Sequence, residues 1–74
     1  MNTIAFPLRV GRALQRRRAS LSISQEKIAA ELGMDRAYYA CIERGQKNIR
    51  MDTLERVCLA LSSRPWEILK DTEE

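Results

Sequence analysis

The chain has 74 residues, 45% of them hydrophobic and 31% charged, a length that allows one domain, expected to span residues 1–74. No apolar run approaches the ~20 residues that a membrane-spanning helix needs, which excludes a transmembrane protein. The last four residues, DTEE, hold three of the ten acids, so residues 1–70 combine thirteen basic with seven acidic side chains, a net charge of +6. Such a charge suits a polyanionic partner, and it is equally compatible with a solvated surface that has no partner.

The first two predicted helices cover residues 7–19 and 25–32. Pro7 suits the first position of a helix. Ser24 is a favoured N-cap for the second helix, and Gly33 is a typical left-handed terminator. Apolar residues recur at helical spacing in both segments, and they are Val10, Ala13 and Leu14 in the first and Ile28, Ala29 and Leu32 in the second. The run of three arginines at 16–18 is expected to divide between helix faces rather than form one phosphate site.

A third helix is predicted to begin after Asp35 and to end at Gly45. Only about three residues separate it from the second helix, a spacing typical of a helix-turn-helix. A fourth helix is predicted over residues 51–61 and a fifth over 65–70. The fifth is too short to be stable alone, so its Trp66 and Leu69 must pack against the domain or another subunit. The expected fold class is therefore all-α, with five helices.

The third helix divides into two sides on a wheel of 100° per residue. The inward side is predicted to hold Tyr39, Ile42 and Glu43, and the outward side Ala37, Ala40, Cys41 and Arg44. Small outward residues favour close approach to a DNA major groove, which is about 12 Å wide and admits a helix. Arg36 in the first turn is then a candidate for bidentate contact with guanine, and Tyr38 for contact with a base or a phosphate.

Further donors flank this helix. Gln46, Lys47 and Asn48 follow its end, where they would meet the phosphate backbone, and Gln25 begins the second helix. Each feature alone has a simpler interpretation, since Arg36 would ordinarily be a solvated arginine and Tyr38 a packing residue. Ala40 and Cys41 alone are equally compatible with close helix packing. The ordered set is what favours DNA binding.

Glu43 requires a partner, because burying half of a carboxylate is costly unless it is paired. Arg18, at the end of the first helix, is the best candidate. In the alternative interpretation, Glu43 bends out to solvent or caps a nearby backbone group.

Four segments carry a resemblance to the Cro/cI-type, or XRE, helix-turn-helix family, and together they span about residues 8–70. They are VGRALQRRR, SQEKIAAELGMD, RAYYACIERG and DTLERVCLALSSRPWEIL. The resemblance implies a five-helix, lambda-repressor-like domain that binds operator DNA as a homodimer, with its third helix in the major groove.

The resemblance also implies roles for individual positions. By matching position, the residues that touch bases or the nearby backbone are Arg36, Ala37, Tyr38, Ala40 and Cys41. Those that touch phosphates are Gln25, Arg44, Lys47 and Asn48. Arg18 and Glu43 occupy the places of a recurrent buried ion pair. The dimer contact is expected from the corner between the last two helices and the fifth helix, at Leu61, Ser63, Arg64, Trp66 and Leu69.

Within this family the chain looks most like the controller proteins of restriction–modification systems, on the segment DRAYYACIERGQKNIRMDTLE. Those proteins regulate their own gene and the endonuclease gene. A small phage-type repressor or an antitoxin-like regulator would look similar. Acidic residues on the second helix, such as Glu26 or Glu31, are candidates for contact with RNA polymerase, and reversing their charge should abolish activation without affecting DNA binding.

Several residues depart from the family pattern. Ser22 replaces a glycine that commonly ends the first turn, so the backbone there is expected to be strained or differently shaped. Ser62 and Ser63 replace the usual glycine–aliphatic turn, so the dimer geometry is expected to differ in detail from that of the family. Tyr39 replaces an aliphatic residue and needs a partner for its hydroxyl if it is buried. Arg50 and Arg64 lie where small polar caps are usual.

Other functions are less well supported. The sequence holds no histidine, no convincing pair of nucleophile and base and no glycine-rich phosphate loop, so we expect neither an enzyme nor a cofactor. The two cysteines lack metal-ligand spacing, and the absence of a signal-peptide pattern predicts a cytoplasmic protein with free thiols. A protein–protein adaptor acting through Trp66, or a redox-sensing regulator acting through Cys41, are the alternatives.

Overall fold

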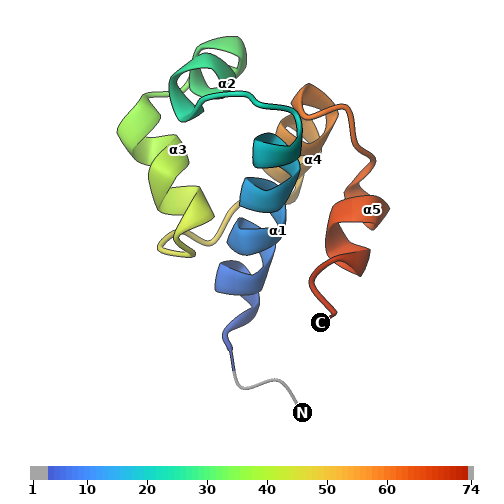
Figure 1. Cartoon of the computed structure of the whole chain (residues 1–74). Helices are drawn as coiled ribbons and strands as arrows, with labels where there is room; N and C mark the ends of the chain where they lie inside the picture. The colour runs from blue at the N-terminus through green and yellow to red at the C-terminus, as the bar shows by residue number, and fades with distance from the viewer. Residues whose placement is uncertain (1–3, 74) are drawn as a thin grey trace.

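The computed structural model describes residues 4–73, and over this range it contains five α-helices and no strand (Figure 1). The helices are α1 (Phe6–Ser20), α2 (Gln25–Leu32), α3 (Arg36–Glu43), α4 (Met51–Ala60) and α5 (Pro65–Lys70). The predicted all-α fold is confirmed. The helix bounds differ from the predicted ones by one residue at each end of α1 and at the end of α4, and α3 ends before Arg44. None of these described helices is both long and apolar enough to cross a membrane.

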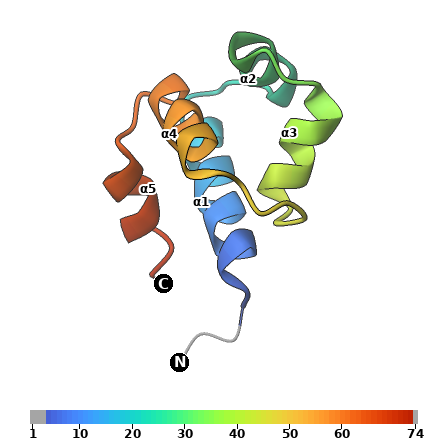
Figure 2. The ribbon, with the colours of Figure 1, turned by 180° about the vertical axis from the view of Figure 1, so that it is seen from behind.

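Helix α1 runs through the middle of the molecule. It packs against α3 on one side and α5 on the other, while α2 contacts α3 and α4, and α4 contacts α5. Figure 2 shows the same arrangement from behind, with α3 and α5 on opposite sides of α1. The helix-turn-helix formed by α2 and α3 therefore occupies one side of the molecule, and the end of the chain occupies the other.

The core forms where the apolar stripes of all five helices meet. The predicted inward residues of α1 and α2 are buried, as are Val57 and Cys58 of α4. Leu54 is only partly buried against this cluster. Ile68 of α5 is buried too, although sequence patterning singled out Trp66 and Leu69 instead. These contacts fix α3 relative to α1, which determines how the third helix is presented.

The turn between α2 and α3 follows its predicted chemistry closely. The Ser24 hydroxyl accepts a hydrogen bond from the Lys27 N–H at 3.0 Å, and Gly33 ends α2 with a φ of 68°. Asp35 lies at the N-cap position of α3, but its side chain makes no capping hydrogen bond with the described residues. Asp35 therefore occupies the predicted N-cap position without forming the capping hydrogen bond that is typical of that position.

Ser22 and Ser62 both adopt positive φ, of 56° and 55°. This confirms the expectation of backbone strain at Ser22, because a Cβ is disfavoured in the left-handed region, and it shows the same conformation at Ser62, for which no strain was predicted. Helices α4 and α5 begin at their predicted residues, directly after Arg50 and Arg64.

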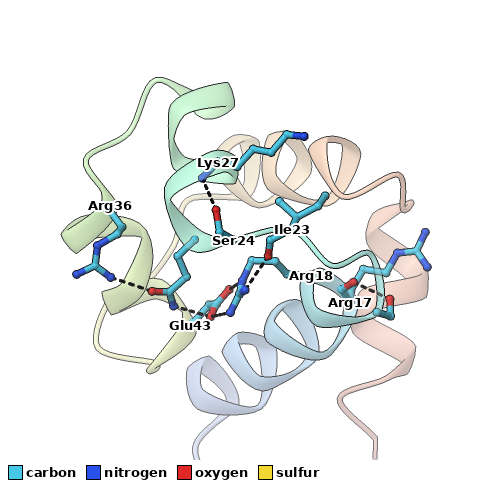
Figure 3. Close-up of polar contacts among 9 residues, drawn as sticks. Arg17, Arg18, Ile23, Ser24, Lys27, Arg36 and Glu43 are labelled. Carbon is cyan, nitrogen blue, oxygen red and sulfur yellow. Dashed lines mark hydrogen bonds and ion pairs between the residues drawn. The ribbon is translucent and has the colours of Figure 1, made fainter.

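The three arginines of 16–18 point to three different parts of the structure. Arg16 Nε donates to Asp71 Oδ2 at 3.0 Å, and Arg17 Nε donates to the Leu61 carbonyl, also at 3.0 Å. Arg18 points the other way, toward α3 (Figure 3). The three arginines lie on different faces of α1, as predicted, and they connect α1 to Asp71 after α5, to Leu61 at the end of α4 and to Glu43 of α3.

The acidic end of the chain folds back onto α1. Besides the contact of Asp71 with Arg16, Glu73 lies 3.2 Å from Arg9, and Thr72 is buried between them. These contacts place acidic charge beside two arginines of α1, on the side of the molecule away from α3 (Figure 1). Residues 25–48, which hold the helix-turn-helix and the polar residues after it, contain four basic and four acidic side chains, so the excess of basic charge lies outside this segment.

Candidate nucleic-acid interface

The N-terminal half of α3 presents an exposed group of side chains. Arg36, Ala37 and Tyr38 are exposed, and Cys41 is partly exposed one turn further on. Ala40 is different, since it is only 3% exposed and belongs to the buried side of the helix. Its predicted placement on the outward side is wrong, because α3 is covered by two helices, α1 and α2, and the covered arc is wider than a single stripe.

The opposite side of α3 anchors the helix in the core. Tyr39, Ile42 and Glu43 are all buried, as the helical wheel predicted. A helix of 8 residues has little stability of its own, so this packing holds α3 in place. The exposed residues are consequently carried on a rigid element rather than on a flexible loop.

A buried ion pair ties α3 to α1. Arg18 Nε donates to Glu43 Oε2 at 2.7 Å and Arg18 Nη2 donates to Glu43 Oε1 at 3.0 Å, a bidentate geometry. Arg18 Nη1 also donates to the Ile23 carbonyl at 2.8 Å (Figure 3). The Glu43 side chain is 3% exposed and that of Arg18 is 14% exposed. The predicted pairing is therefore present, and the alternative of a solvated Glu43 is wrong.

The surroundings of the pair determine its protonation. Burial alone would raise the pKa of Glu43, but the hydrogen bonds from Arg18 and Gln25, together with the neighbouring Tyr39 hydroxyl, outweigh it and keep the pKa below its ordinary value. Burial and the nearby carboxylate raise the pKa of Tyr39. The Tyr39 hydroxyl lies close to the pair, yet it has no hydrogen-bond partner among residues 4–73. The partner that the sequence required for this hydroxyl is thus missing.

Gln25 lies between the ion pair and the exposed start of α3. Its Nε2 donates to Glu43 Oε1 at 2.9 Å, and its Oε1 accepts from Arg36 Nη1 at 3.1 Å. The sequence predicted Gln25 only as a phosphate contact and gave no sign of these bonds. They depend on how α2 packs against α3, because Gln25 at the start of α2 reaches both ends of α3, at Arg36 and at Glu43.

The residues that follow α3 form an exposed polar group. Arg44, Gln46, Lys47 and Asn48 are all exposed. Arg44 Nε donates to Gln46 Oε1 at 3.2 Å, and Lys47 Nζ lies 5.9 Å from the centre of the Tyr38 ring. The structure thus brings Lys47 to Tyr38 and Arg44 to Cys41, whereas Asn48 lines a pocket with Phe6 and Pro7 of α1.

The residues expected at a dimer contact divide into two groups. Leu61 and Ser63 are buried within the single chain, at 0% and 6% exposure, so their side chains serve the core. Arg64 is exposed, Trp66 is 63% exposed, and Leu69 is half-buried. Sequence analysis missed Leu59, which is 56% exposed on α4. The signal was available, because a wheel places Leu59 opposite the inward residues of α4.

The two thiols differ in their surroundings. Cys58 is fully buried, and burial raises its pKa to about 11. Cys41 is partly exposed, with Arg44 Nη2 3.5 Å from its Sγ. Both are free cysteines. Cys58 is therefore a core residue, and a redox role for Cys41 stays a prediction.

Comparison with known proteins places the chain among regulators. It is 34% identical over 68 residues to the control protein C.MunI of Mycoplasma sp, covering 90% of this chain and 92% of that one. It is 38% identical over 58 residues to the control protein C.BamHI of Bacillus amyloliquefaciens, covering 78% of this chain and 72% of that one.

Comparison with solved structures also finds regulators. The restriction-modification controller protein C.AhdI from Aeromonas hydrophila superposes with a TM-score of 0.82 at 32% identity, over 88% of this chain and 98% of that one. The clp gene regulator ClgR from C. glutamicum superposes with a TM-score of 0.90 at 25% identity, over 93% and 90% of the two chains. The sequence profile of the helix-turn-helix family matches residues 14–67. The chain therefore belongs to the helix-turn-helix family, of the Cro/cI type that its sequence resembles.

Proposed function

We propose that the chain is a sequence-specific transcriptional regulator that places α3 in the major groove of operator DNA. The main support is that α3 exposes Arg36, Ala37 and Tyr38 together while its other side is buried. Arginine reads guanine through two parallel hydrogen bonds, and an alanine beside it allows the helix to approach the bases. Cys41 would lie near the same bases. The buried Ala40 offers too little surface to read a base.

The phosphate contacts would come from the polar group after α3. Arg44, Gln46, Lys47 and Asn48 are exposed and would meet the backbone of the same groove. Such contacts fix the position of a protein on DNA and carry no sequence information of their own. Variants of base-reading residues and variants of phosphate-binding residues can therefore be told apart by whether their loss of affinity depends on the DNA sequence.

Replacing Arg36 with alanine should weaken binding to the specific site by about 1–3 kcal/mol and relax the preference at one base pair. Lys47→Ala should instead weaken binding to specific and random DNA alike. Titrations of both variants against both DNAs would measure this difference. A uniform loss for Arg36→Ala would contradict its role in reading bases.

We propose further that the regulator is a homodimer on a near-palindromic operator, with half-sites about one helical turn, ~34 Å, apart. The exposed apolar residues Leu59 and Trp66, with Arg64 and Leu69 beside Trp66, are the surface we assign to this contact. Large exposed apolar side chains favour association, and aromatic residues often dominate such interfaces.

Trp66→Ala should raise the dimer dissociation constant by about 30-fold, equivalent to about 2 kcal/mol, because a buried interface tryptophan is a typical hot spot. Analytical ultracentrifugation would measure it. Lys27→Ala is the control, since Lys27 is exposed on α2, which packs against α3 and α4. Equal effects of the two substitutions would argue against this surface.

The genes under control are proposed from the relatives. Two of them are named control proteins, and a solved relative is a restriction-modification controller protein. We therefore propose that this chain regulates its own gene and a restriction endonuclease gene from the cytoplasm. Glu26 and Glu31 are exposed on α2, where they would contact RNA polymerase. A small phage-type repressor or antitoxin-like regulator remains the alternative, and a helical adaptor the next.

A further inference from the structure

Three arginines form a stripe along one face of α1. Arg9, Arg12 and Arg16 are spaced three and four positions apart, and side chains at these spacings are neighbours on a helix surface. Residues 1–24 of the sequence hold five arginines and no acidic side chain, so no carboxylate of α1 itself balances this charge. The α1 stripe, defined by these three arginines, therefore belongs to the basic charge that lies outside the helix-turn-helix.

The acidic tail, residues Asp71–Glu73, lies against the α1 stripe. Arg16 Nε donates to Asp71 Oδ2 and Arg16 Nη2 donates to the Asp71 carbonyl, both at 3.0 Å. Arg9 Nη1 lies 3.2 Å from Glu73 Oε2 and 3.4 Å from the Thr72 carbonyl oxygen. Figure 2 shows the end of the chain beside α1. Two of the three arginines are thus paired with carboxylates that are 55 and 64 positions away in the sequence.

Thr72 holds the acidic tail in place. It is 1% exposed, and its hydroxyl donates to the Leu69 carbonyl at 2.6 Å. Because Thr72 is buried, the carboxylates on either side of it are presented to α1 instead of being free in solvent. A tethered group competes with a free ligand at a high effective concentration, on the order of millimolar for a short flexible tether. The tail is therefore placed to compete with other anions for the α1 stripe.

The tail also balances the charge of the cleft between α1 and α5. Charged side chains of both signs line this cleft in equal number, and they are Arg16, Arg17, Lys70, Glu67, Asp71 and Glu73. The pairs made by the tail are exposed, since side-chain exposure is 55% for Asp71 and 76% for Glu73, and such pairs contribute little to stability. Neutralising these two carboxylates should therefore leave the chain folded and the cleft with an excess of two positive charges.

We propose that the α1 stripe is a second DNA-binding surface, and that the acidic tail covers it within the same chain. Arg12 is exposed, and Arg16 becomes available once Asp71 leaves it. The partner is the phosphate backbone of duplex DNA, which arginine contacts without regard to base sequence. By covering the stripe, the tail lowers non-specific binding, and a regulator must find its site among a great excess of non-specific DNA. This surface is separate from α3, so the inference goes beyond the function proposed for that helix.

The test measures binding of the full chain to a duplex of random sequence by fluorescence anisotropy. The tail variant, Asp71→Asn with Glu73→Gln, removes two charges and nearly keeps the side-chain shapes. The matched control is Glu31→Gln with Glu55→Gln, which makes the same change in net charge at exposed positions of α2 and α4. At ~50 mM salt we expect the tail variant to bind about tenfold more tightly than the control. The plot of log affinity against log salt should be steeper by about two, because each further phosphate contact adds about 0.9.

Arg16→Gln shows whether the gain comes from the α1 stripe. Added to the tail variant, it should reverse most of the tenfold gain. In the unaltered chain, where Asp71 already occupies Arg16, it should change the affinity for random DNA less than twofold. Circular dichroism checks that each variant is folded, and Glu73→Gln alone, with an expected gain of about threefold, serves if the tail variant is not.

Equal gains in the tail variant and its control would show a general effect of net charge and would overturn this inference. A gain that Arg16→Gln leaves in place would overturn it as well. If the unaltered chain discriminates between DNA sequences and the tail variant gains nothing on random DNA, the proposed function stands and this inference fails. If the tail variant gains affinity and the chain discriminates between no sequences, the inference stands and the proposed function fails.

Discussion

Replacing Gly11 with alanine should destabilise the folded chain by about 3 kcal/mol. A Cβ at this position would lie 2.3 Å from the Glu43 carbonyl oxygen and 2.6 Å from that of Ile42. Both oxygens belong to the backbone at the end of α3, so neither can move without displacing that helix. Within an ordinary helix the same substitution is stabilising by about 0.5–1 kcal/mol, so even the sign of the effect is informative. Urea unfolding followed by circular dichroism would measure it.

Gly33→Ala is the matched control for this experiment. Gly33 has a φ of 68°, and no described atom lies within 4 Å of a Cβ placed there. Its substitution should therefore cost only the local backbone term of about 1–2 kcal/mol. If Gly11→Ala proved as stable as the unaltered chain, the close contact of α1 with the end of α3 would be wrong.

Removing the Glu43 carboxylate should destabilise the fold by about 3–5 kcal/mol, because it leaves a buried guanidinium unpaired. Arg18 has few alternatives, since its side chain is 14% exposed and its other hydrogen bond is to the Ile23 carbonyl. We expect Glu43→Ala to show this loss near neutral pH in a denaturant titration. Arg50→Ala is the control, because the Arg50–Asp52 pair is largely exposed, at 83% and 69%, and such pairs contribute about 0–1 kcal/mol.

The same pair predicts a pH dependence with a definite sign. The pKa of Glu43 is lower in the folded chain than its ordinary value, so the carboxylate stabilises the fold above that ordinary value. This contribution is lost as the pH falls through the lowered pKa of the folded state. Glu43→Gln should remove that part of the acid sensitivity while lowering stability at neutral pH. An unchanged acid profile in Glu43→Gln would show that other carboxylates govern it.

The predictions that succeeded concern features encoded locally or by a strong energetic requirement. Ser24 and Gly33 mark the ends of α2 because capping and left-handed termination depend on neighbouring residues. The Arg18–Glu43 pair spans 25 positions of sequence, yet it could be predicted because a buried carboxylate needs a cation and few are available. These two principles also explain why the helix-turn-helix was located correctly.

The predictions that failed concern features that depend on how many other helices pack against a given helix. A wheel gives Ala40 an outward place, but α3 is covered by two helices, and Ser63 is buried where a dimer contact was expected. The missing partner of the Tyr39 hydroxyl and the two bonds of Gln25 likewise depend on side-chain positions at helix crossings. Sequence periodicity holds no information on these distances.

The most direct test of the account is a gel-shift titration of the full chain with DNA from upstream of its own gene. Random DNA serves as competitor, at ~50 and ~200 mM salt, a range over which a protein that neutralises several phosphates loses orders of magnitude in affinity. We expect a shift that resists random competitor at both salt concentrations, with a second step if two operators adjoin. Binding only at low salt, and equally to both DNAs, would contradict it.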